Sequence, residues 1–178
     1  MLFRSVLPAG HCLWISDGRI SQRKTWIDIG DSWCNAPTGV NISKREITER
    51  VREAIRESVL RHLVADVPIG VFLSGGIDSG AMAALMLESG SKNLTGVTIA
   101  YSEWAGSHED EAPVASRLAQ YYGFSHHIRR VTRAEFLVDL PRILNAMDQP
   151  SIDGINTWYA SKAVAELGLK VVVSGVGG

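Results

Sequence analysis

The sequence has little cysteine, and this limits the kinds of protein it can be. Cys12 and Cys34 are its two cysteines, and the residues around them do not have the spacing of a metal-binding pair. His11 precedes Cys12, but neighbouring residues of a strand point to opposite faces, so a Cys–His catalytic couple is not supported. We therefore expect two reduced thiols and exclude a disulfide framework.

Long hydrophobic runs and an excess charge of one sign are also lacking. No stretch approaches the length of a membrane span and no signal peptide opens the chain, so we expect a cytoplasmic protein without a membrane partner. The net charge of −1 gives no electrostatic footprint for nucleic acid. Basic residues gather from Lys44 to Arg61, but glutamates are interleaved with them, which is typical of a solvated helix face.

The first forty residues differ from the rest in their pattern of apolar and polar residues. Short apolar stretches around Asp17-Gly18 predict a small hairpin. Pro37 and Gly39 then indicate a polar linker. The hydrophobic content of 46% is enough for the core of one domain with an additional small flap.

A helix is predicted to follow this linker. Ser43 and Glu46 form a capping box, and the helix is expected to end near Asp66, just before Pro68. Apolar residues recur along one of its faces at Ile47, Val51, Ile55, Val59 and Leu63.

Short apolar runs then alternate with helical patterns. Strands are predicted over residues 69–73, 94–101, 125–131 and 169–174, and helices over 81–89, 109–123, 132–147 and 156–168. Thr132 and Glu135 form a second capping box, and Pro141 is expected to kink or restart that helix. This alternation predicts an α/β fold with a parallel sheet covered on both faces.

The glycine-rich stretch after the first of these strands lacks the lysine that most ATP-binding loops carry. Residues 74–79, SGGIDS, fit neither the Walker loop nor G-x-G-x-x-G. A loop between a strand and a helix presents main-chain N–H groups to an anion, and Gly75 and Gly76 permit close approach and unusual backbone angles. Asp78 can hold the Mg²⁺ that accompanies pyrophosphate. A loop that grips the β- and γ-phosphates leaves the α-phosphorus open to a nucleophile, which favours adenylation.

This stretch resembles the S-G-G-x-D-S loop of the N-type ATP pyrophosphatases, or PP-loop ATPases. Their fold is the three-layer, adenine nucleotide alpha hydrolase-like sandwich. The segments VPIGVFLSGGIDS, DEAPVASRLAQYYGFSHH and MDQPSIDGINTWYASKAVAELGLKVVVSG are similar, in order and spacing, to the synthetase domain of the glutamine-hydrolysing asparagine synthetases. The segment LPAGHCLWISDG resembles the end of that family's glutaminase domain. We therefore expect residues 1–42 to be the end of a glutaminase domain plus a linker, and residues 43–178 the first part of the synthetase domain.

The resemblance implies a reaction and a set of site residues. In the family, the side-chain carboxylate of aspartate attacks ATP to give β-aspartyl-AMP and pyrophosphate, and ammonia from glutamine then displaces AMP. The implied cofactors are ATP and Mg²⁺, and a homodimer is one expected assembly. The resemblance implies that Leu73 and Ile99 line the adenosine pocket, and that Ser174 and Gly175 contact the nucleotide from its other side. The implied pyrophosphate loop consists of Ser74, Gly75, Gly76, Asp78 and Ser79, with Asp78 near Mg²⁺.

Other polar residues have simpler interpretations. We expect His126 and His127 to pack and form hydrogen bonds rather than to catalyse. Asp110 and Glu111 begin a helix, where acids favour the helix dipole whatever the function. A loop that could face the substrate contains Asp148, Gln149 and Asp153.

The sequence also departs from the family pattern. The motif S-G-E-G-x-D-E reads SGVGG at residues 174–178, so Val176 stands in place of an acid and leaves the acceptor open. The following Asp-Glu pair is absent, and Leu2 stands where the family exposes a cysteine. We therefore expect a piece of a larger synthetase that is inactive by itself. Two alternatives remain: a sibling amidotransferase or β-lactam synthetase-like enzyme acting on another carboxylate, and a non-catalytic nucleotide-binding module.

Overall fold

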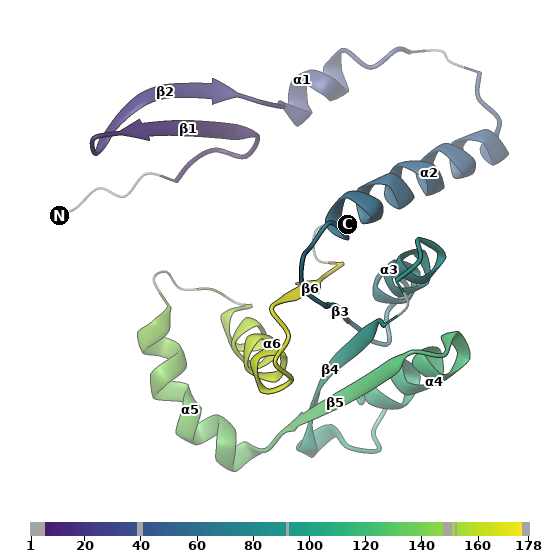
Figure 1. Ribbon diagram of the computed structural model, residues 1–178, viewed down its shortest axis with the longest axis vertical. Coiled ribbons are helices and arrows are strands. Elements are labelled where there is room, and N and C mark those ends of the chain that lie inside the picture. Colours follow the sequence, from purple (N-terminus) through teal and green to yellow (C-terminus); the bar gives the residue numbers. More distant parts are fainter. Residues whose placement is uncertain (1–5, 39–40, 92, 148–150, 152, 176–178) are drawn as a thin grey trace. The chain divides into compact units, whose positions relative to one another are not determined.

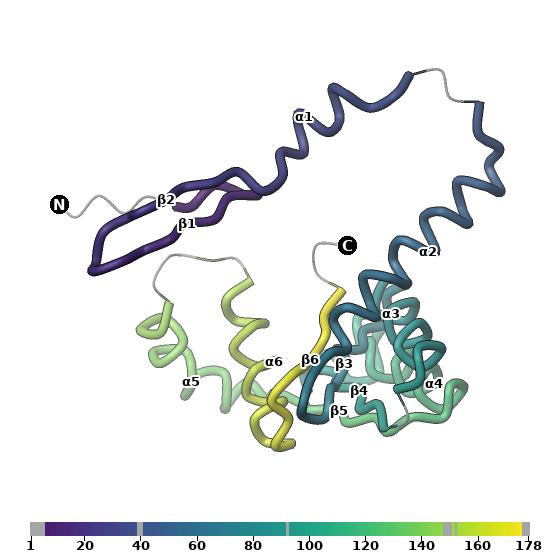
Figure 2. The backbone as a smooth tube through the Cα atoms, turned by 45° about the horizontal axis from the view of Figure 1, so that its top comes forward, coloured from purple at the N-terminus to yellow at the C-terminus, as the bar shows by residue number. Residues whose placement is uncertain are grey.

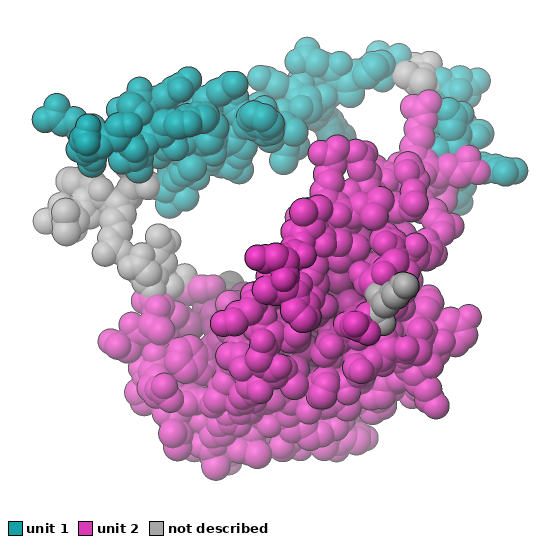
Figure 3. All heavy atoms as spheres, in the orientation of Figure 1, with its two compact units in different colours: residues 1–47 teal, residues 48–178 magenta. Residues whose placement is uncertain are grey.

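The computed structural model describes residues 6–38, 41–91, 93–147, 151 and 153–175. The chain divides into two compact units, Met1–Ile47 and Thr48–Gly178 (Figure 3). Each unit is described by itself below. None of the helices in the described part of the chain is long and apolar enough to cross a membrane.

The first unit contains the predicted hairpin and a short helix. Strands β1 (His11–Ser16) and β2 (Arg19–Thr25) pair antiparallel, with an irregularity in the register between Trp14 and Ile15. Asp17 and Gly18 both have positive φ, as the turn of a two-residue hairpin requires. Helix α1 (Ile29–Cys34) was not predicted; its signal is Asp28, whose carboxylate caps it by accepting a hydrogen bond from the Asp31 N–H at 3.0 Å.

Helix α2 (Lys44–His62) begins as predicted and ends four residues earlier than predicted. Ser43 Oγ accepts a hydrogen bond from the Glu46 N–H at 3.2 Å, which confirms the cap. The C-terminal part of its apolar face, at Val59 and Leu63, packs into the core of the second unit. The earlier residues of that face, such as Val51 and Ile55, are exposed in this structure.

The second unit is built on a four-stranded parallel sheet, which confirms the predicted α/β class (Figure 1). The spatial order is β5-β4-β3-β6, and every neighbouring pair is parallel. The strands are β3 (Ile69–Phe72), β4 (Thr95–Tyr101), β5 (Ser125–Val131) and β6 (Val171–Val173). The chain moves from β3 to β4 and β5 on one side and then returns to place β6 on the other side of β3. The order therefore reverses beside β3, where α/β proteins bind ligands.

Helices cover both faces of the sheet, as the prediction of three layers requires. The helices are α3 (Ile77–Glu88), α4 (Ala112–Tyr122), α5 (Arg133–Ala146) and α6 (Gly154–Glu166), and a single 3₁₀ turn, η1 (Ser102–Trp104), follows β4. Figures 1 and 2 show α3 and α4 on one side of the sheet and α5 and α6 on the other. One buried cluster joins β3 to α2, α3 and α4 through residues such as Val71 and Met86. A second cluster joins β5 to α5 and α6 through Val131, Ile143 and Tyr159.

Capping residues set the helix limits largely as the sequence predicts. Thr132 Oγ1 accepts a hydrogen bond from the Glu135 N–H at 3.2 Å, and Gly123 ends α4 with a φ of 74°. Helix α5 continues through Pro141 without a restart. The largest difference is at α3, which begins at Ile77 rather than near Ala81, so that the predicted loop is shorter.

A network of charged side chains ties α5 and α6 to β5. Arg129 of β5 donates to Glu135 and to Glu166, whose oxygens lie 2.5 Å and 3.1 Å from its guanidinium nitrogens. Lys162 of α6 lies 2.6 Å from Glu135 and 2.7 Å from Asp139. Asp139 is 3% exposed, so its charge needs this partner. The hydrogen bonds from Arg129 and Lys162 together lower the pKa of Glu135 to about 2, although burial opposes them.

Candidate functional site

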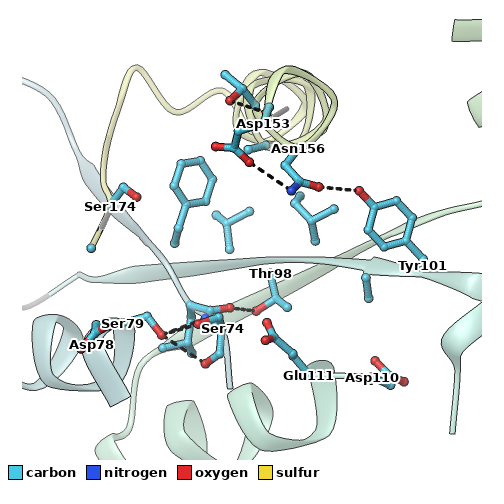
Figure 4. A pocket seen from close by; sticks show the side chains of 18 of the residues that line it. Ser74, Asp78, Ser79, Thr98, Tyr101, Asp110, Glu111, Asp153, Asn156 and Ser174 are labelled. Carbon is cyan, nitrogen blue, oxygen red and sulfur yellow. Dashed lines mark hydrogen bonds between the residues drawn. The ribbon is translucent and has the colours of Figure 1, made fainter. Parts of the chain in front are cut away.

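A cavity of about 870 Å³ opens at the carboxyl edge of the sheet (Figure 4). The ends of β3 and β4, the first turn of α3, the start of α6 and the turn after β6 line it. The sequence-predicted residues that it brings together are Leu73, Ser74, Asp78, Ser79, Ile99, Ser174 and Gly175. Gly75 and Gly76 belong to the same loop but are not among the residues that line the cavity.

Two serines hold the loop in shape. Ser79 Oγ lies 2.8 Å from Ser74 Oγ and accepts a hydrogen bond from the Ser74 N–H at 3.1 Å. Ser79 is buried and also lies within reach of the Ser74 and Gly76 carbonyls, at 3.3 Å and 3.2 Å. Ser74 Oγ accepts from the Gly76 N–H at 3.1 Å. In this structure both hydroxyls therefore serve the loop's own backbone.

The two glycines of the loop do not adopt the unusual backbone angles that the sequence suggested. Gly76 has φ −79° and ψ 157°, an ordinary extended conformation, and Gly75 is not among the glycines with positive φ. A Cβ at Gly76 would meet Ser74 Oγ at 3.1 Å, whereas one at Gly75 would find nothing closer than 3.5 Å. The glycines therefore keep side chains away from the loop rather than supply a special conformation.

Helix α3 begins without a side-chain cap. Its N-cap residue is Gly76, which has no side chain to accept from the first N–H groups. Asp78 lies in the first turn and is exposed. Figure 4 shows its side chain at the α3 side of the cavity. Among the described residues no group of three or more His, Cys, Asp or Glu could hold a metal ion. A metal here would therefore need ligands from a bound molecule in addition to Asp78.

The turn after β6 lies directly against the start of α3. A Cβ at Gly175 would be 3.6 Å from Asp78 Cβ and 3.7 Å from Ser79 N. The pairing of β3 with β6 brings these segments together although about a hundred residues separate them in sequence. Ser174 is exposed at the same turn. Val176, the predicted departure from the family motif, lies outside the described residues.

The predicted adenosine residues differ in their burial. Leu73 is 2% exposed and its side chain belongs to the core, although it also lines the cavity. The Leu73 N–H donates to the Val97 carbonyl at 2.9 Å, and the β3–β4 register ends with the pair of Phe72 and Val97. Both main-chain groups of a residue in a parallel strand point to the same side. Ile99, two residues beyond Val97, therefore directs its N–H and C=O toward the β3 side, past the last of these pairs.

Asp110 is fixed by several donors. Its carboxylate accepts from the Gly106 N–H at 3.3 Å, from the Ala112 N–H at 3.2 Å and from Arg130 at 3.1 Å. Burial raises the pKa of Asp110, but these hydrogen bonds outweigh burial and the pKa is lowered overall. This arrangement agrees with the prediction that Asp110 has a structural role at the start of α4. Glu111 is exposed and lines the cavity.

Asp153, which the sequence placed in a loop that could face the substrate, lines the cavity, but sequence reasoning missed the chain of polar side chains to which it belongs at the α6 side. Tyr101 OH donates to Asn156 Oδ1 at 2.9 Å, and Asn156 Nδ2 donates to Asp153 Oδ1 at 3.1 Å (Figure 4). The ring of Trp104 meets Tyr101 edge-on at 5.1 Å. Burial, and secondarily the charge of Asp153, raise the pKa of Tyr101. The signal available in the sequence was the position of Tyr101 at the end of a predicted strand. Asp148 and Gln149 lie outside the described residues.

The described residues that line the cavity include five carboxylates and no Lys, Arg or His. The carboxylates are those of Asp78, Glu109, Asp110, Glu111 and Asp153. Arg130 is near but is bound to Asp110. An anionic ligand would need a cation to accompany it.

A parallel α/β sheet with a serine- and glycine-rich loop at its switch point defines a class of ligand-binding α/β proteins. The family model described as asparagine synthase matches residues 50–178, which is most of the chain. The chain therefore belongs to the asparagine synthase family, and the resemblance noted from the motifs is confirmed.

Curated relatives include proteins with two kinds of name. "Amidase chry2" of Gibberella zeae is 32% identical over 76% of this chain and 22% of its own length. "Asparagine synthetase B [glutamine-hydrolyzing]" of Escherichia coli is 26% identical over 96% of this chain and 32% of its own length. The chain thus spans between about a fifth and a third of the length of such relatives.

Matches among solved structures include an NH3-dependent NAD synthetase from Campylobacter jejuni. It is 19% identical over 75% of this chain and 56% of its own, with a TM-score of 0.45. A glutamine-dependent NAD+ synthetase from Acinetobacter baumannii, in complex with ADP, gives 17% identity over 76% of this chain and 26% of its own, with a TM-score of 0.46.

Proposed function

We propose that this protein binds Mg·ATP at the switch-point cavity and adenylates a carboxylic acid, which ammonia then converts to an amide. One observation carries the proposal: the cavity brings the loop of Ser74 and Ser79, the carboxylate of Asp78 and the turn at Gly175 together at the start of α3. An uncapped helix start next to a glycine loop favours an anion. Membership of the asparagine synthase family supports the amide-forming chemistry.

The acidic lining supports a role for Mg²⁺. A triphosphate would meet five carboxylates and no basic side chain among the described residues of the cavity. Mg²⁺ usually takes one or two carboxylates and completes its octahedron with phosphate oxygens and water. Asp78 is exposed in the first turn of α3, where it could supply one such ligand beside a pyrophosphate group.

The edge of β4 supports a place for the adenine. Adenine offers a hydrogen-bond acceptor at N1 and a donor at N6, and the N–H and C=O of one extended residue match that pair. Ile99 directs its N–H and C=O to the β3 side, beyond the last β3–β4 pair, and it lines the cavity. With adenine at Ile99 and the terminal phosphates at Ser74–Ser79, the α-phosphorus would lie between them, open to a carboxylate.

The test has two stages because the chain spans part of the length of its relatives. Calorimetric titration of the 178-residue chain should show binding of Mg·ATP that weakens strongly when EDTA removes the metal. In the whole protein, ATP, Mg²⁺, ammonium and a panel of carboxylic acids should yield AMP and pyrophosphate in equal amounts. Production of ADP and orthophosphate would rule out adenylation.

Aspartate is the acceptor that the family resemblance favours, with glutamine as the source of ammonia. A sibling amide-forming activity on another carboxylate is the second candidate. It is favoured by the lack of a basic side chain among the described residues that line the cavity, since free aspartate would bring two carboxylates. Profiling the acceptors separates the two: a strict requirement for aspartate would exclude the second candidate.

A further inference from the structure

A partly buried line of hydrogen bonds runs from α4 through β5 and β4 to the base of the loop. Ser116 Oγ of α4 lies 3.3 Å from His126 Nδ1 of β5. His126 Nε2 lies 2.7 Å from Thr98 Oγ1 of β4. Thr98 Oγ1 in turn lies 2.5 Å from the carbonyl oxygen of Leu73, the residue that precedes the loop. These four residues join α4, β5 and β4 to the segment that follows β3.

The chemistry of the groups fixes the direction of the two bonds at Thr98. A carbonyl oxygen can only accept, so the single hydroxyl hydrogen of Thr98 is donated to Leu73. The Thr98 oxygen can then only accept, so His126 must carry a proton on Nε2. In a neutral imidazole Nδ1 is then bare, and Ser116 donates to it. Burial, and secondarily the charge of His127, lower the pKa of His126 and so favour this neutral form.

The sheet is shaped to hold the imidazole in this place. Gly96 is the residue opposite His126 in the β4–β5 register. A Cβ at Gly96 would lie 3.5 Å from the His126 ring and only 2.8 Å from Phe124. The absence of a side chain at Gly96 leaves room for the ring to lean along the sheet toward Thr98.

The end of the line is the point where β3 stops pairing with β4. The Leu73 N–H still bonds to Val97, but its carbonyl accepts from a side chain, that of Thr98. Thr98 and Leu73 are each 2% exposed, so water cannot readily replace this bond. The orientation of the Leu73 carbonyl sets the direction in which the chain enters Ser74.

We propose that Ser116, His126 and Thr98 form a directional hydrogen-bond chain that fixes the Leu73 carbonyl, and that His126 is thereby a positioning residue for the phosphate-binding loop. The effect on nucleotide binding rests on the proposed function, whereas the tautomer of His126 and the order of the loop do not. His126 does not line the cavity, so it acts through Thr98 and not on a ligand.

The test compares Thr98→Val with Thr95→Val, the same change on the same strand. The Thr95 side chain forms no hydrogen bond with any residue that the structure describes, so its variant controls for the altered strand. In Thr98→Val we expect faster amide hydrogen exchange at residues 75–79 and a roughly tenfold weaker affinity for Mg·pyrophosphate, the size of one lost buried hydrogen bond. In Thr95→Val we expect neither change. Equal behaviour of the two variants in exchange would overturn the proposal.

His126 is tested by its tautomer and by a graded pair of variants. Nitrogen-15 NMR of the wild-type imidazole should show the proton on Nε2, and a proton on Nδ1 alone would overturn the proposal. His126→Gln keeps a donor that can reach Thr98, whereas His126→Leu does not, so the Gln variant should restore part of the loop protection. A purely structural histidine would give equal loop exchange in both variants. If the wild-type chain bound no Mg·pyrophosphate, the proposed function would fail while the exchange and tautomer measurements would still decide this proposal.

Discussion

Gly175 lies against Asp78, so that a Cβ on the glycine would be 3.6 Å from the Cβ of the aspartate. The same Cβ would be 3.7 Å from Ser79 N, in the first turn of α3. Two segments far apart in sequence thus meet over the helix start that we propose as the pyrophosphate site. This contact suggests a variant that changes the site without disturbing the fold.

Gly175→Ala should weaken ligand binding while leaving stability almost unchanged. The added methyl group makes only ordinary van der Waals contacts, so the melting temperature should stay within about 2 °C. The methyl group would cover the Ser79 N–H and so reduce the affinity for Mg·pyrophosphate by roughly tenfold. Gly80→Ala is the matched control, because its Cβ would meet nothing closer than Leu118 at 3.5 Å. Equal affinities for the two variants would contradict the placement of the anion.

Asp78→Ala should weaken the binding of Mg·ATP and Mg·pyrophosphate more than that of AMP. Asp78 is proposed to serve the departing pyrophosphate through Mg²⁺, whereas Ile99 and Leu73 are proposed to contact the adenosine. We expect a loss of about tenfold or more, about 1.4 kcal/mol, for the ligands with a pyrophosphate group. Calorimetric titrations compare the three ligands, and equal losses for all of them would count against the role of Asp78.

Glu135→Gln should lower the free energy of unfolding at neutral pH and make that free energy depend less on pH in the acid range. The pKa of Glu135 is lowered in the folded protein from 4.5 to about 2, chiefly by the hydrogen bond from Arg129. Its ionised form therefore stabilises the fold fully above pH 4.5, and this contribution is lost as the pH falls toward about 2. Urea unfolding from pH 7 to pH 2 measures the effect, expected at about 2 kcal/mol at pH 7.

Glu166→Gln is the matched control for that measurement. Glu166 binds the same Arg129 but its side chain is 47% exposed, against 22% for Glu135. Solvent screens the more exposed pair, so this variant should lose clearly less stability. A larger loss in Glu166→Gln than in Glu135→Gln would show that the interior network is not the one that holds α6.

Gly96→Ala should destabilise the second unit. Its Cβ would lie 2.8 Å from Phe124 Cε2, so the Phe124 side chain would have to move, whereas the His126 ring at 3.5 Å would make an ordinary contact. Such overpacking costs about 1–3 kcal/mol. Thermal unfolding measures the loss, and an unchanged melting temperature would mean that the space between β4 and β5 is larger than this structure has it.

The sequence predicted the α/β alternation because each of its signals is local. Ser43 and Thr132 cap their helices, Gly123 ends α4, and the limits of β5 agree with the prediction residue for residue. These features depend on a few neighbouring residues, whose capping and turn chemistry is independent of the rest of the fold. Helix α1 was missed because its six residues show too short a pattern to compete with the turn signals around them.

The candidate site likewise has a part that local sequence signals predict and a part that depends on tertiary contacts. The loop at Ser74–Ser79 could be found from the sequence because its residues are contiguous, although the start of α3 at Ile77 could not. The chain of Tyr101, Asn156 and Asp153 could not be found, because α6 has to pack beside β4 before those side chains can meet.

By itself, the sequence determined the order of strands and helices in the second unit, the family and the loop, since periodicity, caps and contiguous motifs are written within a few residues. Tertiary structure alone decided that β6 lies beside β3, that Gly175 covers the start of α3, and that His126 reaches Leu73 through Thr98. Each of these contacts joins residues at least 25 positions apart along the chain. Such contacts arise only when the sheet forms and both of its faces are packed, which no local pattern encodes.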